Sequence, residues 1–320
     1  MSAFFFVLAF LIVALFVYMG RYSGRVLAKH SRFIAVPPEA AYERVADLAQ
    51  WQAWNPWLEH APAGTGAEVD GTTLAWDVAH VGRGRVRQLA QTPSRALRQR
   101  LDFDLPFACK GRSDWRFEPA PGGTQVSWRF KGRVAFTLRA FAKTVQGATS
   151  LDLRFGLDRL AAVLENRAPD YTLDYAGLQD QPARLSAQAP YRGPLDTLAA
   201  ELPPRIADVR ARLAAAGLPG EGTAVVHYLK TQLKLRIVDC RVGVELPSDA
   251  ALPTELTLHE QPAHPAYLLR FDGPAEQLEM AWYQAMQRLR VEQRQPDPRL
   301  QPYARYLGPR SVELYLPTRP

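Results

Sequence analysis

The chain has 320 residues, of which 47% are hydrophobic and 10% aromatic, a composition that excludes an intrinsically disordered protein. The length predicts about two domains. The net charge of +7 comes from basic residues spread along the chain rather than gathered in runs, so we expect no nucleic-acid partner. Cys109 and Cys240 lie far apart and the histidines form no HxH or HxxxH pair, so we predict neither a metal site nor a cofactor.

The first segment, residues 1–24, is predicted to be a transmembrane anchor. From Ala3 to Met19 there is no charged residue, and a helix of this length reaches about 26 Å, inside the range that spans a bilayer. A cleaved signal peptide is disfavoured because only Met1 and Ser2 precede the apolar run. Basic residues follow the run, so we expect a single pass through the bacterial inner (plasma) membrane, with the remaining domains in the cytoplasm.

Residues 25–168 are predicted to form an α+β domain. Proline pairs, Gly-Gly turns and apolar spacing divide this part into short strands between two helical segments. We expect strands at 25–36, 73–80, 84–91, 96–104, 114–118 and 124–131, and helices at 39–48 and 136–166.

Several motifs of this part resemble the helix-grip family, also called SRPBCC, START-like or polyketide cyclase/dehydrase-like. The motifs are Val36-Pro37-Pro38-Glu39-Ala40, Asp47, Trp51-x-x-Trp54-x-Pro56-Trp57, Gly122-Gly123-Thr124-x-Val126-x-Trp128, and Gly156-Leu157-x-x-Leu160 with Glu165. The resemblance covers about residues 28–166 and implies a deep, mostly apolar cavity between the long helix and the sheet.

Tryptophans are the candidate ligand contacts of this domain. Trp76, Trp115 and Trp128 lie on three different predicted strands and are expected to line the implied cavity. Inward-facing tryptophans are also ordinary core residues, and that alternative stays open. Three further tryptophans at helical spacing are expected to pack at the base of the fold: Trp51, Trp54 and Trp57.

Arginines alternate on two of the predicted strands. Arg83, Arg85 and Arg87 share one strand face, and Arg98 and Arg100 share another. One interpretation is contact with anionic lipid headgroups near the anchor. The simpler interpretation is a solvated outer face, and both are kept.

Residues 169–320 contain an internal repeat. One copy opens with 191–194 (Tyr-Arg-Gly-Pro) and ends with 242–247 (Val-Gly-Val-Glu-Leu-Pro); the other opens with 271–274 (Phe-Asp-Gly-Pro) and ends with 312–317 (Val-Glu-Leu-Tyr-Leu-Pro). Two copies indicate paired units around one core rather than a solenoid. We expect two βαββ units, with helices at 202–218 and 275–291 on one face of an antiparallel sheet, and a further strand at 171–178 leading into them.

The last strand of each copy supplies the candidate site. Alternation places Glu313 and Tyr315 on the face away from the helices, and Glu245 on the same face in the other copy. Gly243 stands where Glu313 stands in the second copy and is expected to leave room at the junction.

This half resembles the GyrI-like small-molecule-binding domain, also called the bacterial transcription activator effector-binding domain. The resemblance covers about residues 171–318 and rests on Asp174-Tyr175, Gln181-Pro182, the paired Gly-Pro turns and the two strand motifs. It implies an aromatic-lined groove whose acid pairs with cationic amphiphiles, and Glu313 stands at that position. The remaining expected groove residues are Tyr315, Glu245, Tyr228 and Trp282.

Three functions follow from these patterns. The preferred one is a membrane-anchored, non-catalytic binding protein for hydrophobic or cationic amphiphilic small molecules. The second is a cyclase-like or hydrolytic enzyme, for which a Glu245–Glu313 carboxylate pair is the arrangement to test. The third is a membrane-associated interaction or scaffold module with closed pockets.

Overall fold

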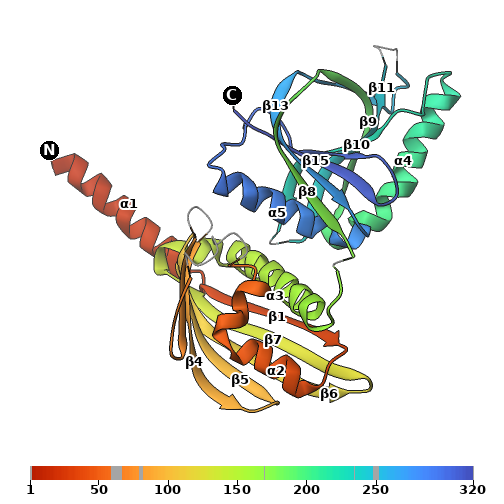
Figure 1. The fold of residues 1–320 in the computed structure, drawn as a ribbon. Coiled ribbons are helices and arrows are strands. Elements are labelled where there is room, and N and C mark those ends of the chain that lie inside the picture. Colours follow the sequence, from red (N-terminus) through yellow and green to blue (C-terminus); the bar gives the residue numbers. More distant parts are fainter. Residues whose placement is uncertain are drawn as a thin grey trace. The chain divides into compact units, whose positions relative to one another are not determined.

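The computed structural model describes residues 2–58, 67–78, 82–168, 170–233, 235–247 and 252–319. The chain divides into two compact units, Met1–Ala168 and Pro169–Pro320 (Figure 1). Each unit is an α+β structure built on an antiparallel sheet.

The first helix, α1 (Ser2–Gly20), forms where the apolar run predicts it. Among the residues that the structure describes, no helix is long and apolar enough to cross a membrane. The transmembrane anchor expected for residues 1–24 is therefore not supported. With 19 residues, α1 reaches about 28 Å, slightly less than a hydrocarbon core of about 30 Å.

The first unit is a seven-stranded antiparallel sheet with a long helix against it. The strand order is β1-β7-β6-β5-β4-β3-β2, and α3 packs on β1 and β7. Its strands are β1 (Arg25–Ile34), β2 (Ala67–Asp70), β3 (Thr73–Val78), β4 (Gly82–Thr92), β5 (Ala96–Leu105), β6 (Cys109–Ala120) and β7 (Gly123–Val134). Its helices are α2 (Pro38–Ala46), η1 (Leu48–Ala53), η2 (Phe136–Phe141) and α3 (Ala142–Leu164).

Alternation of buried and outward residues explains the strands that the sequence predicts. On β7, for example, Val126, Trp128 and Phe130 are buried while Arg129 and Lys131 point outward. Two differences are found. Strand β2 lies in a stretch expected to be a turn, and the helix expected from 136 is a 3₁₀ segment followed by α3. The expected end of the strand 73–80 lies outside the described residues.

The second unit is an eight-stranded antiparallel sheet of order β12-β9-β11-β10-β14-β15-β13-β8. Its strands are β8 (Thr172–Gln181), β9 (Arg184–Pro194), β10 (Ala224–Gln232), β11 (Ile237–Leu246), β12 (Thr257–Gln261), β13 (His264–Asp272), β14 (Tyr303–Tyr306) and β15 (Ser311–Pro317). Its helices are η3 (Leu195–Thr197), α4 (Leu198–Ala215), η4 (Ala275–Gln277) and α5 (Leu278–Val291). The two repeat copies are β9-α4-β10-β11 and β13-α5-β14-β15, and they meet where β10 pairs with β14.

Both helices of the repeat cover the same sheet face. Val226 packs in the α4 cluster and Ala304 in the α5 cluster, and these residues are direct partners across the β10–β14 junction. Helix α4 begins at Leu198, before the expected start at 202, so Pro203 and Pro204 lie inside it. The curved sheet (Figure 1) turns its other face toward a second buried cluster, which includes Tyr303 and Tyr315. The side chains on this face were expected to be open to solvent, and they are largely buried.

Candidate functional site

An arginine held by two carboxylates lies on the sheet face opposite α4 and α5. Arg305, on β14, donates from Nε and Nη2 to the two carboxylate oxygens of Glu245 on β11, at 2.8 and 3.0 Å. Its Nη1 donates to Oε2 of Glu313 on β15 at 2.9 Å. Adjacent-strand register explains the second contact, because Arg305 and Glu313 are direct partners in the β14–β15 pairing. The acids of the two repeat copies therefore converge on one planar cation.

The side chains of this cluster are themselves partly buried. The side chains of Arg305, Glu245 and Glu313 are 15%, 15% and 13% exposed. The hydroxyl of Tyr315 donates to Glu313 Oε2 at 2.7 Å. Two further arginines lie at the edge, with Arg270 3.6 Å from Glu313 and Arg184 3.8 Å from Glu245. Charge-assisted contacts of this kind are about twice as strong as neutral hydrogen bonds.

The predicted site residues Glu313, Tyr315 and Glu245 are thus brought together, but in a different role from the one expected. We expected Glu313 to be the acid of an aromatic-lined groove, left free to pair with the cation of a ligand. It is instead a partly buried ion-pair partner of Arg305. The space attributed to Gly243 is also filled, because a Cβ there would lie 2.3 Å from the carbonyl oxygen of Ala187.

A stack of rings extends from this cluster across the same sheet face. Tyr315 stacks on Tyr303 with ring centroids 4.6 Å apart, and Tyr303 stacks on His227 at 5.2 Å. His227 contacts the His259 ring at 4.5 Å, and its Nδ1 lies 2.8 Å from Gln188 Nε2. Burial, with a smaller contribution from the neighbouring imidazole of His259, lowers the pKa of His227 to about 3. His227 is therefore neutral and accepts at Nδ1.

Stability of the second unit should fall on acidification because of His227. The unfolded chain takes up a proton near pH 6.5, whereas folded His227 does so only at about 3. The stabilisation is therefore complete above pH 6.5 and is lost as the pH falls toward 3; by about pH 5 the loss is about 2 kcal/mol. Urea unfolding of the full chain above pH 6.5 and at pH 5 measures this loss of stability. His227→Gln should remove this part of the slope, and an unchanged slope in the variant would refute the assignment.

The predicted residues Tyr228 and Trp282 lie on the opposite, helix-covered face. Their rings make an edge contact with centroids 5.1 Å apart, and Tyr228 packs with both the α4 and the α5 clusters. Burial raises the pKa of Tyr228 to about 12 and holds that of Tyr306 well above its ordinary value. The structure therefore separates these aromatic residues from Glu313, and the single groove expected to contain all five is not formed.

Tryptophans fill the interior of the first unit. Trp76, Trp115 and Trp128 face inward as expected and are 4%, 1% and 0% exposed. Trp115 and Trp128 stack with centroids 4.1 Å apart, since they are direct partners in the β6–β7 pairing. Trp54 contacts both rings edge-on, at 5.9 and 6.0 Å. Rings from η1 and the sheet thus pack against one another in the interior, and a ligand-lining role for these tryptophans stays a prediction.

Helix α3 closes onto this ring cluster. A Cβ at Gly156 would lie only 2.7 Å from Cζ3 of Trp128, so the missing side chain lets the helix approach the indole. Trp57 Nε1 donates to Asp152 Oδ2 of α3 at 3.1 Å, and Trp128 Nε1 donates to Ser113 Oγ at 2.7 Å. The N–H groups of Trp57 and Trp128 are thus satisfied within the core, whereas Nε1 of Trp54 is buried without a hydrogen-bond partner among the described residues.

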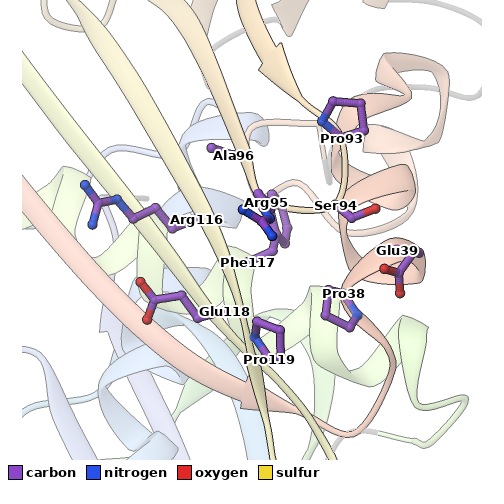
Figure 2. A pocket seen from close by; sticks show the side chains of 10 residues that line it. All are labelled: Pro38, Glu39, Pro93, Ser94, Arg95, Ala96, Arg116, Phe117, Glu118 and Pro119. Atoms are coloured by element: carbon purple, nitrogen blue, oxygen red, sulfur yellow. The ribbon is translucent and has the colours of Figure 1, made fainter.

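A hollow of about 470 Å³ opens on the outside of the first unit, beside the start of α2 (Figure 2). It lies between α2, the β4–β5 turn and the end of β6. Its lining is prolines and charged side chains around Phe117, namely Pro38, Glu39, Pro93, Ser94, Arg95, Ala96, Arg116, Glu118 and Pro119. It contains none of the predicted site residues.

Arg305 is the functional candidate that the sequence analysis missed. Its signal was the alternation Tyr303-Ala304-Arg305-Tyr306, which puts Tyr303 and Arg305 on one strand face. The strand was recognised only within a generic βαββ pattern, so the partner of Glu313 was not sought on it.

Comparison with known proteins agrees with the fold of the first unit. A long helix against a curved antiparallel sheet with a tryptophan-rich interior defines this unit as an α+β ligand-binding fold. The family model described as "Polyketide cyclase / dehydrase and lipid transport" matches residues 25–165. The first unit is therefore a polyketide cyclase/dehydrase-like domain, as the resemblance implied. Among curated proteins, no sequence matches the chain.

Solved structures show low similarity. The Zhui aromatase/cyclase from a Streptomyces species is 14% identical and has a TM-score of 0.35, covering 44% of this chain and 94% of that one. A protein from Chromobacterium violaceum is 18% identical, with a TM-score of 0.34 and coverages of 43% and 96%. EcmrR in a complex with DNA is 16% identical, with a TM-score of 0.39 and coverages of 57% and 70%. Similarities of this size say nothing about ligand or activity.

Proposed function

We propose that the chain is a non-catalytic binding protein for amphiphilic organic cations and that the second unit, a GyrI-like domain, holds the site. The observation that carries the proposal is the convergence of Glu245 and Glu313, one from each repeat copy, on the guanidinium of Arg305. The site already binds one planar organic cation, which belongs to the chain itself. Tyr315 lies beside the cluster, with its hydroxyl on Glu313 and one ring face stacked on Tyr303, and an aromatic ring near a carboxylate favours a cation.

In this proposal a ligand cation competes with Arg305 for the two carboxylates. Arg305 is held by its contacts to both acids, so its release leaves two charges that must be compensated in a partly buried place. A ligand with a delocalised cation and an apolar body compensates them and contacts the tyrosines. A neutral ligand of the same shape does not.

A pair of ligands and a pair of variants test this function. A lipophilic cation should bind the full-length chain, and Glu313→Gln should weaken its binding by about 1.5–3 kcal/mol, the value of a charge-assisted contact. Binding of a neutral ligand of similar size and shape should change little. Asp174→Asn is the matched control, because its 65% exposed carboxylate meets only Arg270 among these residues. Calorimetry measures the binding. If wild type and Glu313→Gln bind the cation equally well, the carboxylate of Glu313 does not contribute to cation binding and this part of the proposal is wrong.

A second candidate function is an interaction or scaffold module, and the filled interior of the first unit favours it. Trp54, Trp115 and Trp128 contact one another between η1 and the sheet. If neither hydrophobic nor cationic ligands bind the chain, the interaction or scaffold function is the one supported.

The enzyme alternative has less support. Glu245 and Glu313 each accept hydrogen bonds from Arg305 rather than sharing a proton, so they do not form the acid–base pair that the alternative requires. The bacterial inner membrane, with both units on the cytoplasmic side, remains the proposed location, and fractionation of cells that express the full-length chain tests it.

A further inference from the structure

The outward face of the first unit's sheet is strongly basic. Residues at alternate positions of β1 and β4 to β7 point away from α3 and are exposed or half-buried. The basic ones are Arg25, Lys29, Arg83, Arg85, Arg87, Arg98, Arg100, Lys110, Arg112, Arg116, Arg129, Lys131 and Arg133. This set is called the basic face below. It combines the two arginine stripes that the sequence shows with three further strands.

Strand register sets like charges directly opposite one another on the basic face. One row runs across four strands as Lys131, Arg112, Arg100 and Arg87, each the partner of the next. Arg25 and Arg133 are likewise partners, as are Lys29 and Arg129. Like charges placed opposite each other destabilise a sheet. A face that exists only to be solvated has no need of such rows, so they indicate an anionic partner.

Acidic residues neutralise only part of the basic face. Asp114 pairs with Arg98 at 3.0 Å and with Arg112 at 3.1 Å, and Asp102 pairs with Arg100 at 2.7 Å. Within the described residues, the row members Arg87 and Lys131 have no carboxylate within 4.0 Å.

The character of the face and its connection to α1 indicate which anion it fits. The outward positions of β4 to β7 carry no aromatic side chain, whereas platforms for single-stranded nucleic acid stack bases on aromatic rings. A broad sheet face also cannot enter a duplex groove, which admits a helix or a two-stranded ribbon. The described apolar side chains of α1 are exposed, for example Phe6 (77%) and Phe10 (72%), and α1 leads directly into β1. An apolar helix that leads in the chain into a strand of the basic face matches a lipid bilayer with anionic headgroups.

We propose that the basic face docks on the surface of an anionic lipid bilayer. Basic side chains near such a surface each add attraction that is screened within a Debye length. The contribution is therefore expected to depend on lipid charge and on salt, whereas the apolar contribution of α1 depends on neither.

Vesicle sedimentation of the full-length chain tests the proposal. The wild type should partition more than tenfold better onto phosphatidylcholine vesicles that contain phosphatidylglycerol than onto phosphatidylcholine alone, and added salt should abolish the difference. The combined variant Arg100→Gln, Arg112→Gln, Lys131→Gln should lose one to two orders of magnitude of binding to the anionic vesicles. The midpoint temperature of its thermal unfolding should be unchanged or slightly raised, because a row of like charges is removed.

A control of equal charge separates the face from net charge. Arg192→Gln, Arg290→Gln, Arg294→Gln removes three exposed charges from the second unit and should change anionic binding less than threefold. Equal loss in both triple variants would overturn the proposal, as would partitioning that ignores lipid charge. A row variant that loses affinity for a short DNA duplex but not for anionic vesicles would assign the face to nucleic acid instead.

Discussion

Arg305→Ala is expected to destabilise the second unit by about 3 kcal/mol, because it leaves Glu245 and Glu313 without their shared cation in a partly buried place. The figure lies at the lower end for buried pairs since the side chains keep 13–15% of their exposure. Urea unfolding of the full-length chain measures it. Arg270→Ala is the matched control, as its side chain is 48% exposed and lies 3.6 Å from Glu313; it should change stability by less than about 1 kcal/mol.

The same variant links stability to binding. If the carboxylate pair accepts organic cations, a small alkylguanidinium at millimolar concentration should restabilise Arg305→Ala and leave the wild type unchanged, since it binds the folded state alone. The lipophilic cation should also bind Arg305→Ala more tightly than the wild type, because it no longer competes with an internal guanidinium. An Arg305→Ala variant as stable as Arg270→Ala, with no response to alkylguanidinium, would contradict the description of this cluster.

The faces of the repeat strands could be predicted from sequence, but the contacts between them could not. Alternation alone puts Val312 and Leu314 toward the helices and Glu313 and Tyr315 on the other side, and the structure has them so. The contact of Glu313 with Arg305 depends on the register of β14 against β15. A slip of one residue would reverse the face of Arg305. No local pattern fixes that register before the turn between the strands is known.

A related limit applies to the first unit. The strand and helix pattern, the family motifs and the inward direction of the tryptophans were all accessible from sequence. Inward direction alone does not say whether rings line a space or fill it. The answer depends on the pairing of Trp115 with Trp128 and on how closely α3 approaches at Gly156. These distances join residues far apart in the sequence, so the motifs that implied a cavity could not give them.

Trp128→Ala should show whether the tryptophans stand in for a ligand. The side chain is fully buried and contacts Trp54, Trp57 and Trp115. Its removal should destabilise the first unit by about 4 kcal/mol, the sum of lost apolar transfer and the cavity left behind. Leu89→Ala, at a 49% exposed position on β4, is the control and should change stability by no more than about 0.5 kcal/mol.

The cavity left by Trp128→Ala is also a binding test. The cavity is lined by aromatic rings and by the hydroxyl of Ser113, which loses its indole donor. A largely apolar cavity accepts a small aromatic molecule, and the N–H of indole can replace the lost donor, so saturating indole should recover part of the lost stability in the variant and none in the wild type. That result would mean that the helix-grip interior keeps the capacity to hold an aromatic ligand and that its own indole occupies the place. A stability loss below about 1 kcal/mol would show that the rings are not close-packed. A full loss that indole does not reverse would show that the interior collapses once the ring is gone, and the first unit would then act through its surface rather than through a pocket.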